Sequence, residues 1–134
     1  MIVDSSALIE VVRSQPRAAA CIETLERTPL IQMSAANYLE ACIGADNRAM
    51  APFAGDLDLL IRDYRILIVP VSVDHARIAR IAHRQYGRGN HNDSRAKLNF
   101  GDCFAYALAR EKNEPLLFVG DDFAHTDIRS ALDH

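Results

Sequence analysis

The apolar residues of the chain gather in four short runs separated by longer amphipathic stretches. The runs are residues 1–3, 30–33, 66–71 and 116–119. Each is too short for a helix and has the length of a strand. Because the apolar residues in each run are continuous rather than alternating, we expect buried strands of a parallel sheet that is covered on both faces.

The amphipathic stretches between these runs predict helices. We expect them at residues 5–13, 17–27, 34–48, 55–64, 73–86 and 100–112, with a last short helix near 126–132. Pro29, Gly87 and Pro115 follow three of these stretches and are typical helix terminators. Strands that alternate with helices indicate crossover units and an α/β fold with a mostly parallel sheet.

The helix predicted at residues 34–48 carries one apolar face. Its members, placed on a helical wheel, are Ala35, Ala36, Leu39, Cys42 and Ile43. We expect this face to pack on the core. Glu40 falls just outside its edge, so its side chain is expected to point either along the sheet or into water.

Length and composition predict one domain, residues 1–134, with an ordinary globular balance of 49% hydrophobic and 25% charged residues. No apolar run approaches the ~18 residues of a membrane span, and the first residues do not resemble a signal peptide. The three cysteines are far apart and suggest neither a disulfide framework nor a metal pair. These features predict a cytoplasmic protein with reduced thiols and no membrane contact.

Acidic residues follow the predicted strands at the edge where parallel sheets bind ligands. Asp4 ends the first run, and Asp121 and Asp122 follow the fourth. Asp102 lies near the start of the helix at 100–112, and Glu40 lies in the helix at 34–48. A cluster of such carboxylates would need a cation, protonation or separation, and hard oxygen ligands suit Mg²⁺ or Mn²⁺.

Each acid also has a purely structural interpretation. Asp4 suits the N-cap of the following helix, and Asp102 suits a capping box with Asn99. Asp121 and Asp122 suit a turn, and Glu40 suits an exposed helical surface. Spacing alone does not decide between these interpretations and a shared site.

Four segments of the chain resemble VapC-type members of the PIN-domain family, in the same order and at similar spacing. They are residues 1–8 (MIVDSSAL), 34–40 (SAANYLE), 98–109 (LNFGDCFAYALA) and 116–128 (LLFVGDDFAHTDI). The resemblance covers the whole chain. It implies a PIN fold, a three-layer α/β/α arrangement with a central parallel sheet of four or five strands.

The resemblance also implies an activity, that of a Mg²⁺-dependent endoribonuclease acting on single-stranded RNA as the toxin of a VapBC-type pair. By position, Asp4 and Asp102 would be the principal metal ligands, with Glu40 and one acid after the fourth strand completing the catalytic set. Asp121 is the first choice for that acid, and Asp122 and Asp127 are the alternatives. Ser6 is a candidate supporting residue, either through a water molecule on the metal or simply as a helix cap.

The resemblance further implies a homodimer and a VapB-type antitoxin whose C-terminal segment covers the acidic site. An all-acidic pocket would favour an arginine or lysine from such a partner. Asn37 stands where many relatives carry a hydroxyl residue, which is a minor departure from the family pattern. A thiol nucleophile at Cys103 is not expected, since consecutive helical residues point ~100° apart.

The net charge of −3 does not by itself indicate a nucleic-acid-binding protein. Arg77, Arg80, Arg84 and Arg88, however, recur at helical spacing. This arginine stripe is either a binding surface, which guides RNA phosphates toward the acidic site or meets the acidic parts of an antitoxin, or a solvated helix face. His91 and His125 are expected to be exposed loop residues.

Two other classes of protein compete with the ribonuclease. A phosphoryl-receiver or phosphatase domain would need a nucleophilic aspartate in a context such as Asp-x-Asp, which the sequence after Asp4 lacks. A catalytically idle PIN-fold binding module would keep the fold without the reaction, and metal-dependent RNA cleavage separates it from the enzyme.

Overall fold

The computed structural model describes residues 1–47, 52, 54–89 and 95–132. Its elements are, in chain order, β1 (Ile2–Val3), α1 (Ser5–Val12), α2 (Ala18–Arg27), β2 (Gln32–Ser34), α3 (Ala35–Asp46), α4 (Ala54–Asp63), β3 (Leu67–Val69), α5 (Val73–Tyr86), α6 (Phe100–Lys112) and β4 (Leu116–Leu117). Among the described residues, none of the helices is both long and apolar enough to cross a membrane.

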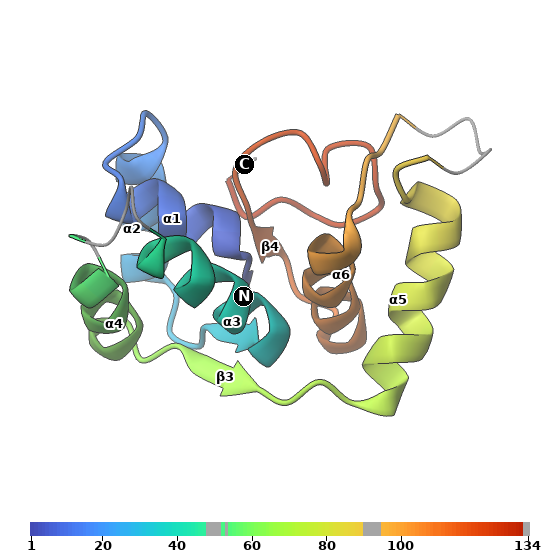
Figure 1. Ribbon diagram of the computed structural model, residues 1–134, viewed down its shortest axis with the longest axis horizontal. Coiled ribbons are helices and arrows are strands. Elements are labelled where there is room, and N and C mark those ends of the chain that lie inside the picture. The colour runs from blue at the N-terminus through green and yellow to red at the C-terminus, as the bar shows by residue number, and fades with distance from the viewer. Residues whose placement is uncertain (48–51, 53, 90–94, 133–134) are drawn as a thin grey trace.

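The strands form a parallel sheet in the order β3-β2-β1-β4 over the described residues. The chain builds outward from β1 to β2 and β3, then passes through α5 and α6 to place β4 on the other side of β1 (Figure 1). The direction of winding therefore reverses between β1 and β4. In open α/β sheets, such a reversal marks the edge position at which ligands bind.

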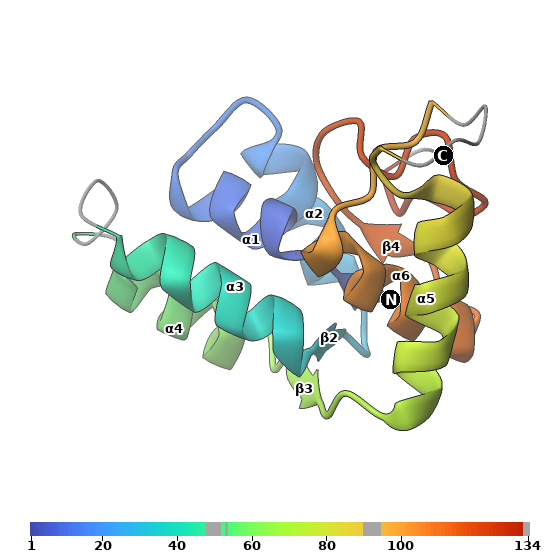
Figure 2. The same ribbon diagram turned by 45° about the vertical axis from the view of Figure 1, so that its right-hand side comes forward.

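Two hydrophobic clusters cover the two faces of the sheet. Val3 and Leu117 belong to the cluster formed with α1, α2, α3 and α4, whereas Ile2 and Leu116 belong to the cluster formed with α5 and α6. Neighbouring residues of one strand thus face opposite layers, as the pleat of a strand requires. Figures 1 and 2 show the same layers, with α5 and α6 on one side of the sheet. The predicted three-layer α/β/α fold is confirmed.

Helix boundaries agree with the predictions where capping signals are strong. Ser72 and Asn99 each form a capping box, and α5 and α6 have the predicted bounds to the residue. The helix predicted at 34–48 runs over Ala35–Asp46, and the end of that prediction falls partly outside the described residues.

The helix predicted near residues 126–132 was wrong. The Leu116 N–H donates to the Arg129 carbonyl, and the Ala131 N–H donates to the Leu116 carbonyl, both at 2.9 Å. Ser130 forms a parallel bridge with Leu116. The free edge of β4 therefore binds this segment in an extended form, since an unpaired strand edge offers more hydrogen bonds than a marginal turn of helix.

The expectation for the apolar face of α3 was wrong in part. Leu39 and Ile43 are exposed, at 59% and 62%, while Ala41 and Ala45 lie in the core. The small side chains on that face bring α3 close to α1, and a Cβ at Gly44 would lie 3.7 Å from Cδ1 of Ile9.

Burial of strand β3 was also overestimated, because β3 is an edge strand whose Leu67 is 52% exposed.

Candidate active site

Asp4 lies at the carboxyl end of β1, at the point where the sheet reverses its winding. It caps α1, since its Oδ2 accepts the Ser6 N–H at 3.1 Å. The residue is only 3% exposed, and its Oδ1 has no hydrogen-bond partner within the described part of the chain. Burial, with the charge of Glu40 adding to it, raises the pKa of Asp4 to about 6, although hydrogen bonds from Ser6 oppose the shift. Capping and a place in the acidic cluster are thus both correct for this residue.

Asp102 occupies the first turn of α6, where the predicted capping box forms. Its Oδ2 accepts the Asn99 N–H at 3.0 Å, and its own N–H donates to Asn99 Oδ1 at 2.9 Å. Burial raises its pKa to about 7, against the hydrogen bond from Asn99, and the charges of Asp4 and Asp122 add to the rise. Asp102 is therefore both a helix cap and a neighbour of two other acids.

The neighbouring thiol of Cys103 is not suited to attack a substrate. It is buried, donates to the Asn99 carbonyl at 3.3 Å, and burial raises its pKa to about 11. A neutral thiol is a poor nucleophile. The structure therefore agrees with the expectation that Cys103 has no catalytic part.

Glu40 lies on α3, in the helical layer opposite the one that contains α6 and Asp102. Its Oε1 accepts the Ser5 hydroxyl at 2.6 Å, and the Asn37 amide lies 3.4 Å from the same oxygen. Its charge contributes to the raised pKa of Asp4. Of the two orientations left open for Glu40, the side chain takes the one along the sheet edge toward the other acids.

The turn after β4 determines which of the two acids that follow it lies near Asp102. Gly120 has a φ of +100°, a backbone conformation that favours glycine, and it turns the chain directly before the two aspartates. The charge of Asp122, which is half-buried, contributes to the raised pKa of Asp102, whereas Asp121 is exposed. The geometry therefore favours Asp122 over the first choice, Asp121.

Asp127 takes part in a different contact. Its Oδ1 accepts the Tyr106 hydroxyl at 2.7 Å, and its Oδ2 pairs with Arg110 at 3.0 Å. Both oxygens thus hold the C-terminal segment against α6. The structure does not bring Asp127 into the acidic cluster.

Ser6 connects α1 to the segment after β4. Its hydroxyl accepts the Val119 N–H at 3.1 Å, and its backbone N–H donates to Asp4. It therefore fixes the chain between two of the acidic positions. The cap of α1 is Asp4 rather than Ser6, and the supporting role of Ser6 in the reaction stays a prediction.

As they stand, no three Asp, Glu, His or Cys side chains among the described residues are close enough to hold one metal ion together. The donor set nevertheless fits a divalent cation. It consists of carboxylate oxygens, one of them buried without a partner within the described part of the chain at Asp4, and burial together with neighbouring acidic charge raises the pKa values of Asp4 and Asp102. A cation with oxygen preference is the group that such a site would bind.

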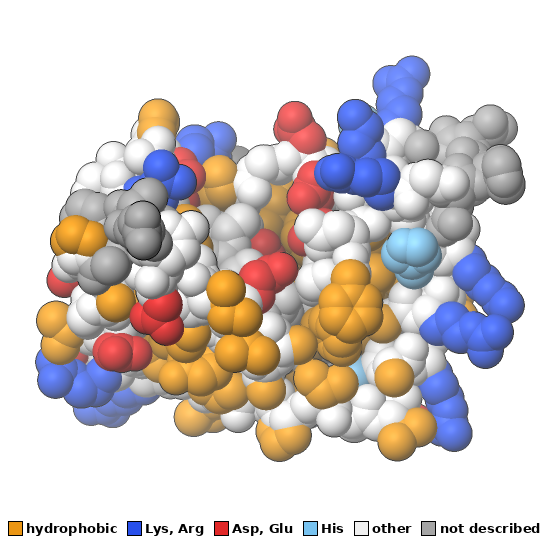
Figure 3. Space-filling model, viewed as in Figure 1, with side chains coloured by type: hydrophobic (Ala, Val, Ile, Leu, Met, Phe, Trp, Pro, Cys, Tyr) orange, Lys and Arg blue, Asp and Glu red, His pale blue; other side chains and the backbone are white. Residues whose placement is uncertain are grey.

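Three arginines of the stripe lie on α5, and Arg88 follows the end of that helix at Gly87. Arg77, Arg80, Arg84 and Arg88 are all exposed, and Arg77 pairs with Asp74 at 3.3 Å. Arg80 and Arg84 line an apolar groove together with Phe100 and Phe104. Figure 3 shows basic side chains along one edge of this view and acidic ones near its middle. Both interpretations of the stripe stay open.

His125 is exposed as expected, and His91 lies outside the described residues.

The structure also reveals an apolar surface that the sequence did not predict. Phe100 is 80% exposed, and with Leu39 and Ile43 it lines a shallow groove that includes Glu40. Figure 3 shows hydrophobic side chains gathered below the acidic residues on this face. A contiguous apolar surface beside a site is typical of a protein–protein contact.

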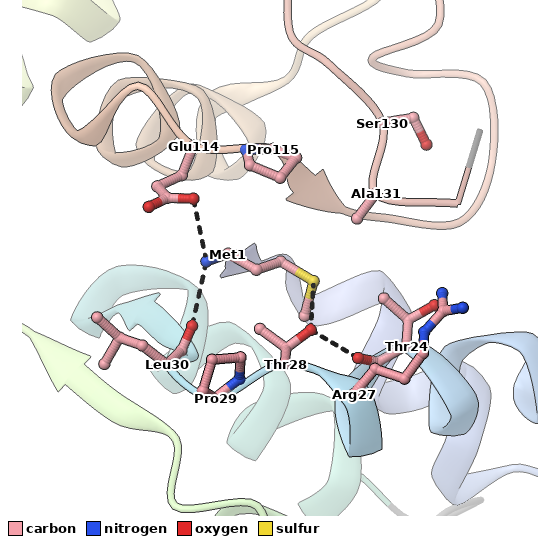
Figure 4. A pocket seen from close by; sticks show the side chains of 10 residues that line it. All are labelled: Met1, Thr24, Arg27, Thr28, Pro29, Leu30, Glu114, Pro115, Ser130 and Ala131. Atoms are coloured by element: carbon pink, nitrogen blue, oxygen red, sulfur yellow. Dashed lines mark hydrogen bonds and ion pairs between the residues drawn. The ribbon is translucent and has the colours of Figure 1, made fainter. Parts of the chain in front are cut away.

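A separate pocket of about 480 Å³ lies at the opposite end of the strands. Around it, the Met1 amino group donates to the Leu30 carbonyl at 3.1 Å and to Glu114 at 3.3 Å, and Thr28 bonds to the Thr24 carbonyl (Figure 4). Glu114 is the one carboxylate that lines it. This pocket therefore offers no second acidic cluster.

Comparison with known proteins agrees with the fold and extends it. The PIN-domain family model matches residues 1–129. Ribonuclease VapC42 of Mycobacterium tuberculosis is 47% identical over 131 residues, which cover 98% of both chains. Among solved structures, Mycobacterium tuberculosis VapC20, described as a sarcin-ricin loop cleaving toxin, superposes with a TM-score of 0.74 at 15% identity, covering 95% of both chains. A toxin–antitoxin complex from Klebsiella pneumoniae gives 0.71 at 18% identity, covering 97% of this chain and 96% of that one.

Proposed function

The chain belongs to the PIN-domain family, among the VapC ribonucleases, and from this premise we propose that it hydrolyses phosphodiester bonds of single-stranded RNA with the help of Mg²⁺. One observation carries the proposal. Asp4, Glu40, Asp102 and Asp122, from four separate segments, interact at one edge of the sheet. Mn²⁺ is an alternative ion with the same ligand preference.

The residues have separable roles in this proposal. Asp4 and Asp102 hold the ion, and Glu40 and Asp122 complete the set. When bound, the ion supplies charge neutralisation at the phosphate and lowers the pKa of water. No protein nucleophile is needed, in keeping with the neutral thiol of Cys103.

The ion also resolves the electrostatic problem of the site. Two carboxylates ~4 Å apart repel by ~4 kcal/mol at an effective dielectric of 20. Without a cation this repulsion favours protonation, and it adds to burial, the larger cause of the raised pKa values of Asp4 and Asp102. A bound cation relieves it without a proton, leaving the carboxylates charged at neutral pH.

We propose two partners, a VapB-type antitoxin that restrains the toxin in the cytoplasm and a second copy of the chain. The Klebsiella pneumoniae neighbour is a toxin–antitoxin complex. The acidic edge would accept a basic side chain from an antitoxin. The exposed apolar side chains of Leu39, Ile43 and Phe100 offer a surface that association with a second copy would bury.

The experiment that tests the function is cleavage of a labelled single-stranded RNA by the purified protein. Cleavage with Mg²⁺ or Mn²⁺, loss of cleavage with EDTA and recovery on adding the ion are expected. An unaltered RNA under every metal condition would favour the catalytically idle module.

A further inference from the structure

Glu40 is an exposed helical glutamate whose carboxylate is nevertheless held in place. The Ser5 hydroxyl, from the first residue of α1, donates to its Oε1 at 2.6 Å. The Asn37 amide, one turn earlier on α3, lies 3.4 Å from the same oxygen. An untethered surface glutamate samples several rotamers, so these contacts select one orientation.

Asn37 links this carboxylate to the helix that carries Asp102. The side chain is completely buried, and its Nδ2 donates to the Gly101 carbonyl at 2.9 Å. Its Oδ1 is buried and has no hydrogen-bond partner within the described part of the chain. An unsatisfied buried amide oxygen destabilises a fold. Asn37 is therefore not explained by stability alone, which is typical of residues that serve a functional site.

Gly101 provides the space that Glu40 occupies. A Cβ at this position would overlap the Glu40 carboxylate, with Oε2 as its nearest atom. The absence of a side chain lets the glutamate lie over Gly101 in the first turn of α6. From there its charge reaches Asp4 and contributes to the rise in that residue's pKa.

From this geometry we infer that Ser5 and Asn37 are positioning residues, which hold the Glu40 carboxylate over Gly101 and so direct it toward Asp4 and Asp102. The inference rests on the proposed function, because the reaction in which Glu40 takes part is the one proposed above. Ser5 acts only through Glu40, whereas Asn37 also binds the Gly101 carbonyl. Removal of the Ser5 hydroxyl should therefore matter when Glu40 is present and should not matter when Glu40 is absent.

The experiment is a double-mutant cycle with Ser5→Ala, Asn37→Ala and Glu40→Ala. Each positioning variant alone should lower kcat for RNA cleavage by about tenfold and leave KM nearly unchanged, since the substrate still binds. Added to Glu40→Ala, Ser5→Ala should cause no further loss. Thr24→Ala is the control, because it removes another buried hydroxyl, one that donates to the Ala20 carbonyl within its own helix, and it should retain wild-type kcat.

A second measurement does not depend on catalysis. The affinity for Mn²⁺, titrated calorimetrically, should fall several-fold in Ser5→Ala, and should be equal in Glu40→Ala and in Ser5→Ala/Glu40→Ala. Should Asn37→Ala fail to fold, Ser5→Ala alone decides the matter.

The outcomes separate the inference from the function it rests on. If the wild type cleaves RNA and Ser5→Ala matches it in kcat and in Mn²⁺ affinity, the positioning role is refuted and the function stands. Equal losses with and without Glu40 would likewise refute it, because they indicate a general structural effect. If the wild type binds Mn²⁺ without cleaving RNA, the function fails and the titration still tests the inference. A wild type that neither cleaves RNA nor binds Mn²⁺ overturns both.

Discussion

The carboxyl groups of Asp102 and Asp122 lie close enough together that the charge of Asp122 contributes to the raised pKa of Asp102. The two residues come from the first turn of α6 and from the turn after Gly120. The fold thus brings together two acids that repel each other when both are ionised.

The first prediction concerns the stability of the metal-free protein as a function of pH. Asp102 has a pKa of about 7 in the fold against 3.8 as the unperturbed value. Between these values the folded state binds more protons than the unfolded chain, so the free energy of unfolding should fall as pH rises. The loss should reach about 2 kcal/mol between pH 5 and pH 7.5 and level off above that range.

Thermal melts in EDTA across this range measure the effect. Asp102→Asn serves as the control, because it removes one of the two titrating groups and should reduce the pH dependence to the smaller part due to Asp4, whose pKa is raised to about 6. A wild-type melting temperature that is constant or rises from pH 5 to pH 7.5 would contradict the prediction.

The second prediction separates the two acids after β4. Asp122 contacts Asp102, while Asp121 is exposed. We expect Asp122→Asn to lower kcat/KM for RNA cleavage by at least ~100-fold, or ~2.7 kcal/mol, and Asp121→Asn to change it by less than ~threefold. The two variants have the same change of charge on adjacent residues, so each controls for the other. The reverse order of effects would reinstate Asp121 as the fourth acid.

The extent to which the sequence predicts this fold depends on how local the signals are. α5 and α6 have the predicted bounds because their ends are set by short-range hydrogen bonds. Ser72 and Asn99 cap their first turns, and Gly87 caps the end of α5. The segment near Ser130 is extended because it binds β4, whose free edge is set by the strand order. This pairing depends on the strand order of the whole sheet, so the local pattern of apolar residues, which predicts a helix, gives no sign of it.

The same distinction applies to the candidate site. The strand-end position of Asp4 and the order of the four segments are visible in the sequence. The choice between Asp121 and Asp122 depends on the turn at Gly120, whose positive φ no pattern displays. The contact between Asn37 and Gly101 joins residues 64 positions apart. The spacing of three between Asn37 and Glu40 was the one available signal, since it places both on one side of a helix.

The third prediction concerns the stability cost of the buried charge at Asp4. Asn keeps the cap of α1 and removes the charge. In EDTA at pH 7.5, Asp4→Asn should therefore be more stable than the wild type by roughly 1–2 kcal/mol. Mg²⁺ should stabilise the wild type and narrow the difference, since the variant lacks a ligand.

Asp127→Asn is the matched control for this comparison. It weakens the contacts with Tyr106 and Arg110 and should lower the melting temperature instead. Equal melting temperatures and equal Mg²⁺ responses of Asp4→Asn and the wild type would show that Asp4 is a helix cap only.

The fourth prediction tests the arginine stripe. Arg80→Gln/Arg88→Gln should weaken RNA binding and reduce the slope of log affinity against log salt by about 1–2, if both arginines contact phosphates. Arg62→Gln/Arg65→Gln changes the charge equally at the end of α4 and should leave the slope unaltered. An identical slope in both double variants would mean that the stripe is a solvated helix face.

The central claim is that the acidic cluster carries out metal-dependent RNA cleavage, and Asp102→Asn tests it most directly. Asn at this position can still accept the Asn99 N–H, so α6 should keep its cap and the circular dichroism spectrum should be unchanged. The measurement is the cleavage rate of a labelled single-stranded RNA by wild type and variant, each with Mg²⁺ and with EDTA. We predict cleavage by the wild type with Mg²⁺ alone, and a rate at least ~1,000-fold lower, or ~4 kcal/mol, for the folded variant under the same conditions. A folded Asp102→Asn that cleaves RNA at the wild-type rate, or a wild type that is equally active in EDTA, would contradict the account.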